Sequence, residues 1–203
     1  MPANTDIANR SLRKVGGSRI TSFTQGTKNA NAVEDIFEDL RDELLDYPWN
    51  FASERAKLAR LSTAPGFGWD HAYAMPDQWL RTRSVHDNVD GTGVIFYYME
   101  QVAGQIALVT SADTVYIRYV KRVTDPNLWS VGFRHAYVDA LARELAIPIA
   151  GSKLLFEKLE RTARRTLAAA KSTDSIQSFP ERRPRGSWVT SRRVTSYSDH
   201  YQH

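Results

Sequence analysis

The sequence lacks the features that mark several large classes of protein. It contains no cysteine among its 203 residues, which excludes disulfide bonds and thiolate metal sites. It has no apolar run near the ~20 residues of a membrane-spanning helix, and its N-terminal stretch lacks the apolar segment of a signal peptide. We therefore expect a soluble protein that is made in a cytoplasm, contacts no membrane and folds around an apolar core without cross-links.

Motifs of common catalytic and phosphate-binding sites are also missing. No HExxH, GxSxG or GxxxxGK pattern occurs, and the five histidines are scattered. His200 and His203 have the spacing of metal ligands but end a polar tail, which favours solvated residues. The glycines at 66–68 and 91–93 do not lead from a strand into a helix, which favours turns over a phosphate loop. The sequence therefore predicts no enzyme activity, no cofactor and no metal site.

Net positive charge is nearly absent from most of the chain, although the whole sequence carries +4. Residues 176–203 hold five arginines and two carboxylates, and so account for +3 of that charge. The same segment shows no helical or strand period and has too few apolar residues to form a core of its own. It is predicted to be an extended arm that becomes ordered on a partner. An ordinary unordered terminus is the alternative.

Helical periodicity occurs toward the two ends of the chain. Apolar residues at a spacing of three and four predict four helices, at about 5–15, 28–46, 127–147 and 152–171. The second helix is expected to stop before Pro48 and the third before Pro148, because proline disfavours helical geometry in the residue that precedes it.

Strand patterning fills the middle of the chain, at about 50–123. Large and small residues alternate over 69–75, and 80–85 predicts a second short strand. Three further runs, separated by short turns, predict one antiparallel meander; they span 94–102, 105–110 and 114–120.

The predicted fold class is therefore α+β. An antiparallel helical bundle is built from both chain ends, a small antiparallel β subdomain is inserted between them, and an extended C-terminal arm follows. The body would span 1–175 and the arm 176–203.

The second predicted helix carries a dense group of carboxylates. Seven acidic residues lie between positions 34 and 46, with Arg41 as the one basic residue among them. A solvated surface is the ordinary interpretation, and paired acids for glycoside hydrolysis would need one raised pKa in a cleft. The third interpretation is complementarity with a basic surface on a second copy, which would fix the register between copies. For such inter-subunit faces the candidates are Glu34, Glu38 and Asp42 on the acidic side and Arg161, Arg164 and Arg165 on the basic side, while the first helix offers Arg10, Arg13 and Lys14.

Aromatic residues concentrate in the predicted β subdomain, with basic residues near them. Three interpretations are open: sheet core, a protein interface, and a stacking platform for single-stranded nucleic acid. A small sheet covered by helices needs bulky core residues, which favours the first. The aromatic residues are Trp49, Phe51, Phe67, Trp69, Tyr73, Trp79, Phe96, Tyr97, Tyr98, Tyr116 and Tyr119, and the basic neighbours are Arg81, Arg83, Arg118 and Lys121.

Three segments of the body follow one another in a specific order. They are SLRKVGGSRITSFTQGTKNANAVEDIFEDLRDELLDYPWNFASERAKLA at 11–59, YAMPDQWLR at 73–81 and LAIPIAGS at 145–152. Together they resemble the head-to-tail adaptor family of short-tailed bacteriophages, also called tail tubular protein A. Tyr47 stands where many relatives have histidine. After Thr173 the resemblance is limited to the general character of the tail, including Gly186-Ser187-Trp188.

This resemblance implies a non-enzymatic virion protein at the head–tail junction, assembled in the host cytoplasm. Family members form a ring of twelve copies whose helical domains surround a channel for the genomic DNA. The implied partners are the portal protein, the tail nozzle protein and further copies of the chain. The arm is expected to bind the portal through two aromatic anchors and five arginines that pair with acidic sites, namely Phe179, Arg182, Arg183, Arg185, Trp188, Arg192 and Arg193.

Two other functions are weighed beside the adaptor. The alternative is a nucleic-acid-binding module that uses the basic tail and the aromatic sheet, and it predicts DNA binding that weakens steeply with salt. A cell-wall hydrolase is a third hypothesis, which requires one acid whose removal abolishes activity while leaving assembly intact.

Overall fold

The computed structural model describes residues 3–93 and 95–177 of the chain. These residues form four α-helices, one short 3₁₀ helix and six strands. The helices are α1 Asn4–Lys14, α2 Lys28–Leu45, α3 Val131–Ala150 and α4 Lys153–Ile176, and the 3₁₀ helix η1 is Asn50–Ala52. The strands are β1 Ser53–Lys57, β2 His71–Ala74, β3 Trp79–His86, β4 Tyr98–Val102, β5 Gln105–Thr110 and β6 Tyr116–Lys121. The seven predicted portal-binding residues, Phe179, Arg182, Arg183, Arg185, Trp188, Arg192 and Arg193, lie outside the described residues.

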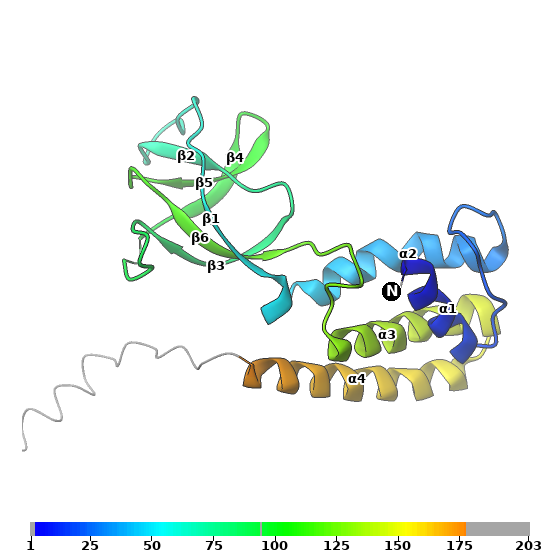
Figure 1. The fold of residues 1–203 in the computed structure, drawn as a ribbon. Coiled ribbons are helices and arrows are strands. Elements are labelled where there is room, and N and C mark those ends of the chain that lie inside the picture. Colours follow the sequence, from blue (N-terminus) through cyan, green and yellow to red (C-terminus); the bar gives the residue numbers. More distant parts are fainter. Residues whose placement is uncertain (1–2, 94, 178–203) are drawn as a thin grey trace, which may run out of the picture.

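The predicted α+β class is confirmed. Two helices precede the strands and two follow them, and these four helices pack together as a helical body. The β subdomain, formed by β1 to β6, is inserted between α2 and α3 and lies beside one end of the helical body (Figure 1). Helices from the two halves of the chain therefore share one core.

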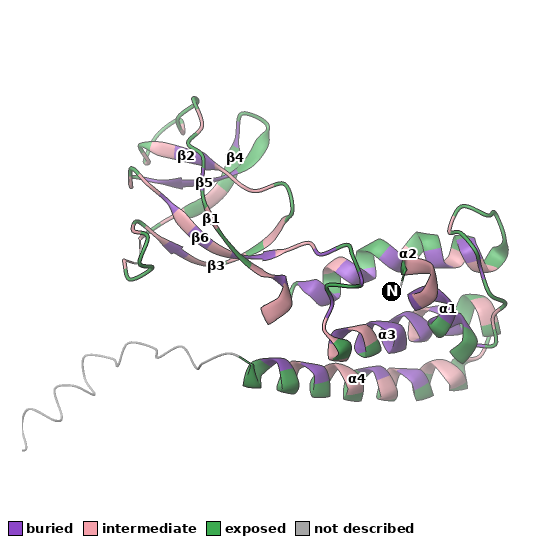
Figure 2. Ribbon diagram, in the orientation of Figure 1, coloured by how far each residue is buried: buried purple, intermediate pink, exposed green. Residues whose placement is uncertain are grey.

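The helix α3 is the central element of the helical body. It packs against α4, α1 and α2 and is buried around most of its circumference (Figure 2). Phe133, Tyr137 and Leu141 form its fully buried stripe, and the Tyr137 hydroxyl donates a 2.5 Å hydrogen bond to the carbonyl of Phe37 on α2. Burying each side chain of this size contributes about 1.5–3 kcal/mol to the free energy of folding. Because α3 buries several of them against its neighbours, it holds the other three helices together.

The limits of α3 differ from the prediction at both ends. The helix begins at Val131, four residues after the predicted start at 127. Before it, the Asp125 side chain accepts a hydrogen bond from the backbone N–H of Asn127 and forms a turn. The Ser130 hydroxyl then caps the helix by accepting from the Phe133 N–H at 3.2 Å. The helix also continues through Pro148 to Ala150, and the prediction that it stops before this proline is wrong. Tertiary packing maintains this last turn, because Leu145 and Ala146 are fully buried there.

The six strands form two antiparallel sheets, in the orders β1-β6-β3 and β2-β5-β4. The predicted meander is wrong for its third strand: β4 and β5 form a hairpin, whereas β6 joins the other sheet between β1 and β3. The strand β1, with the polar sequence SERAK, was not predicted. The two sheets share a core that includes Tyr73, Leu108, Ile117 and Tyr119, and this long-range packing decides where β6 pairs.

Contacts at the junction fix the β subdomain to the helical body. Asp174, near the end of α4, accepts hydrogen bonds of 3.1 and 3.2 Å from the backbone N–H of Asn50, and the Asn50 side chain donates to the Asp174 carbonyl at 2.6 Å. Burial raises the pKa of Asp174 above its usual value, with the Asn50 hydrogen bond opposing the shift. The last turn of α4 is therefore held at the entrance to β1.

Candidate functional site

The exposed face of α2 is acidic. Val33, Phe37 and Leu40 point into the core, and the intervening positions of the helix place carboxylates in solvent (Figure 2). The exposed acidic residues are Glu34, Asp35, Glu38, Asp39 and Glu43. This amphipathic pattern confines the negative charge to one surface of the helical body.

Two arginines neutralise part of this acidic face from within the chain. Arg41 is almost fully buried, and it donates to Asp42 at 3.0 Å and lies 3.4 Å from Glu38. Asp42 also lies 2.8 Å from the Nε atom of Arg122, which follows β6. Asp42, a candidate for an inter-subunit contact, is thus engaged inside its own subunit, where it ties α2 to the β subdomain.

The other carboxylates of α2 are not engaged in this way. Within the described residues, Glu34, Asp35, Asp39 and Glu43 take part in no ion pair. Their charges are therefore available to a basic surface outside the subunit.

The exposed face of α4 is basic, and its three candidate arginines differ in their contacts. Arg161 and Arg165 are exposed, and the Arg161 guanidinium donates only to the backbone carbonyl of Glu157, at 3.4 Å. The Glu157 and Arg161 side chains therefore form no ion pair, although their i, i+4 spacing allows one. Arg164 does pair with Glu160 at the same spacing, at 2.5 Å.

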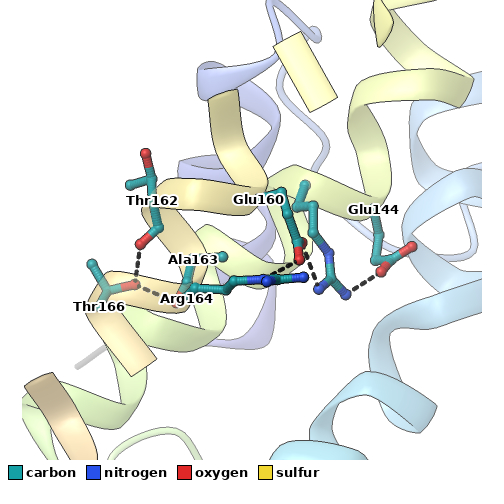
Figure 3. A network of polar contacts seen from close by, with 7 residues as sticks. Glu144, Glu160, Thr162, Ala163, Arg164 and Thr166 are labelled. Carbon is teal, nitrogen blue, oxygen red and sulfur yellow. Dashed lines mark hydrogen bonds and ion pairs between the residues drawn. The ribbon is translucent and has the colours of Figure 1, made fainter. Parts of the chain in front are cut away.

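Glu160 connects Arg164 to a network that joins α4 to α3 (Figure 3). Its second oxygen lies 3.1 Å from Arg143 of α3, which also forms an ion pair with Glu144. The hydrogen bond from Arg164, followed by that from Arg143, holds the pKa of Glu160 below its usual value against the opposing effect of burial. Arg164 thus serves the α3–α4 contact, and Arg161 and Arg165 are the candidates that face outward.

A second basic surface lines a groove between α1, α3 and α4. The groove has a volume of about 480 Å³ and is lined in part by Arg10 and Arg13 of α1 and by His135 of α3. Arg10 and Arg13 form no ion pair among the described residues. The sequence placed both arginines on the first helix, but the position of His135 beside them follows from the packing of α1 on α3.

One buried ion pair closes the base of this groove. Asp139 lies on the buried side of α3 and pairs with Lys14 of α1. The Ser11 hydroxyl donates to the carbonyl of the neighbouring Val138 at 3.0 Å. Asp139 is not among the candidates taken from the sequence. A carboxylate between the apolar positions Val138 and Ala140 of a helix nevertheless indicates that a basic or hydrogen-bonding partner must lie beside it.

The two charged faces lie on opposite sides of the helical body. In Figure 1, α3 runs between α2 and α4, and in Figure 2 the exposed residues of α2 and α4 follow opposite edges of the view. A negative surface and a positive surface of one subunit therefore point away from each other.

The aromatic residues divide between core and surface. Trp49, Tyr73 and Tyr119 are buried, which agrees with the core interpretation for these three. Phe67 and Phe96 are instead 93% and 88% exposed. Tyr98 is also exposed, at 65%, and the other aromatic residues of the set are half-buried, so the core interpretation holds for only part of the set.

The described residues contain neither a metal-binding group nor a membrane-spanning helix. No group of three or more histidine, aspartate or glutamate side chains is placed to hold a metal ion. Among the described helices, none is both long and apolar enough to cross a membrane. No protein-family model matches the chain, and no curated protein matches it.

Proposed function

We propose that this chain is a structural subunit that forms a ring, and that the ring is the head-to-tail adaptor of a phage virion. It would join the portal protein to the tail nozzle protein and surround the channel through which genomic DNA passes. The observation that carries the proposal is the placement of an acidic face on α2 opposite a basic face on α4.

Opposed faces of unlike charge favour assembly from head to tail. A contact between two different patches is heterologous, and repeated copies of it close into a ring when the rotation per subunit permits. The outward charges are Glu34 and Glu38 on one side and Arg161 and Arg165 on the other. Such exposed pairs add little stability one by one, but across an interface they reject wrong partners and set register.

The resemblance to the adaptor family supports the position in the virion. One of the stretches that carry it, Pro48-Trp49-Asn50-Phe51, lies at the junction of the helical body and the β subdomain. Trp49 is fully buried there, and its indole N–H donates to the carbonyl of Leu44 at 2.8 Å. The residues that carry the resemblance are thus residues on which this arrangement of helices and strands depends.

The end of α4 supports the role expected of the arm. Asp174 holds this end against Asn50, so the chain leaves each subunit at a defined place. In a ring, all copies of the segment after Gln177 would then start from equivalent positions. Many weak arms on one ring bind a symmetric partner as a multivalent set.

The proposal is tested by mixing the purified full chain with the portal protein of the same phage. We expect small species of the chain alone and rings seated on the portal after mixing, observed by electron microscopy and by light scattering on a sizing column. A chain ending at Gln177 should fold with an unchanged melting temperature but fail to attach. The proposal would be contradicted if no rings of the chain formed on the portal particles, even at saturating concentrations of the full chain.

A further inference from the structure

One face of the β1-β6-β3 sheet is basic. The register places Arg55 opposite Arg118, and Lys57 opposite Tyr116, on the same side of the β1–β6 ladder. The alternate residues Ala56 and Ile117 point to the other side, into the core of the β subdomain. Toward the end of β1 away from the helical body, this basic side is open.

The open part of this face is hollowed. The loop that follows β3 and the strands β1 and β6 enclose a volume of about 350 Å³. Arg55, Lys57 and Arg118 contribute cationic groups to its lining, and Asp90 contributes the carboxylate. The hollow therefore has a net positive charge.

Arg55 and Lys57 are the solvent-facing cations of this hollow. Both are exposed, and neither has an ion pair within the described part of the chain. The Lys57 ammonium lies 5.8 Å from the centre of the Tyr116 ring.

His86 lines the rim of the hollow. Its Nδ1 lies 2.7 Å from the carbonyl of Gly93, which requires a proton on Nδ1. Its Nε2 lies 2.9 Å from the Ser84 hydroxyl, which can donate to it. These two contacts hold the imidazole ring in place at the rim.

We infer that this face, centred on Arg55 and Lys57, binds the phosphates of a nucleic acid backbone. Residues two apart on a strand are about 6.6 Å from each other, close to the separation of neighbouring phosphates along one nucleic acid strand. The planar guanidinium groups match the geometry of phosphate oxygens. The site differs from the basic tail and aromatic sheet weighed from the sequence, and it depends on the sheet register rather than on ring formation.

The test measures binding of the full chain to a fluorescent DNA duplex at about 50 to 200 mM salt. The double variant Arg55→Ser/Lys57→Ser is compared with Lys28→Ser/Lys153→Ser, which removes the same charge from exposed helix starts remote from the sheet. We expect the first variant to weaken binding about tenfold and to reduce the slope of log affinity against log salt by about 2. The matched control should bind like the unaltered chain. Circular dichroism and melting temperature verify that both variants fold.

Three outcomes would overturn the inference. One is equal weakening by the two double variants, which would mean that binding follows total charge. Another is no measurable binding by the unaltered chain at the lowest salt. The third is competition by polyglutamate that equals competition by unlabelled duplex at the same charge, because the face would then accept carboxylates as readily as phosphates.

Discussion

At the scale of single residues, Lys14 and Asp139 form the most consequential polar contact of the helical body. Asp139 is 3% exposed and lies on the helix that touches all the others. Lys14 reaches it from α1 while keeping part of its own side chain in solvent. Removing one partner of a buried pair costs more than the pair contributes, because the remaining charge is left in the interior.

Lys14→Met should therefore lower the free energy of unfolding by about 2 kcal/mol, less than the ~3–5 kcal/mol of a fully enclosed pair, because water reaches the lysine. Urea unfolding at neutral pH measures the change. Lys14→Met/Asp139→Asn should regain most of the loss. A single variant as stable as the parent would show that Asp139 finds another partner.

Gly151 is the residue on which the turn between α3 and α4 depends. Its φ of 62° lies in the left-handed region, and a side chain at this position would meet no atom within 4 Å. Gly151→Ala should therefore destabilise the fold by about 1–2 kcal/mol through backbone strain alone. Gly66→Ala is the matched control, because that position has equal space and an ordinary φ. Equal melting temperatures for the two variants would contradict the explanation.

At the scale of elements, the Glu160 network decides how the α3–α4 contact responds to acid. Arg164 and Arg143 hold the pKa of Glu160 below the usual value of a glutamate carboxyl. A carboxyl whose folded pKa is depressed contributes stability that is fully present above its unfolded pKa and is lost as the pH falls through the folded pKa. The contribution is thus complete at neutral pH, begins to fall as the pH drops through the usual range of a glutamate carboxyl, and is lost below the depressed folded pKa.

Glu160→Gln should lower the melting temperature at pH 7 by a few degrees and have a smaller effect near pH 3. Thermal scans of both proteins across this range measure the difference. The exposed Glu157→Gln is the control, since its side chain accepts no ion pair from Arg161. A difference between Glu160→Gln and the parent that is constant with pH would exclude this role for the carboxylate.

The helices were predictable because the cause of each is local. Apolar residues at 3–4 spacing in α1, α2 and α4 match the buried positions that the structure assigns to them. The end of α3 was not predictable in this way. Pro148 carries a local preference against helix, and the buried neighbours Leu145 and Ala146 override it through contacts with other elements.

At the scale of the whole molecule, charge reversal tests whether copies assemble through α2 and α4. Glu34→Lys/Glu38→Lys reverses two of the five exposed carboxylates of α2, and Arg161→Glu/Arg165→Glu reverses the two outward arginines of α4. Each variant alone should fail to form rings on the portal, because like charges would meet at every interface. Sedimentation or electron microscopy of the portal mixtures measures ring formation.

A mixture of the two double variants should restore rings, since alternating subunits again bring unlike charges together. Combining all four substitutions in one chain should restore them as well. Rings formed by either double variant alone as readily as by the parent would mean that other surfaces join the copies and that these faces are ordinary solvated helix faces.

The amino-acid sequence alone determined the class of the fold, the approximate position of each helix and the surplus of acid on α2, because these follow from periodicity and composition within short windows. Only the tertiary structure decided that β6 pairs with β1 and β3 and not with β5, the strand that precedes it in the chain. It also decided that Asp42 and Arg164 form ion pairs inside the subunit, whereas Glu34 and Arg161 form none among the described residues. The physical reason is the same in each case: strand pairing and charge neutralisation depend on residues that are distant in the chain and meet only when the core forms.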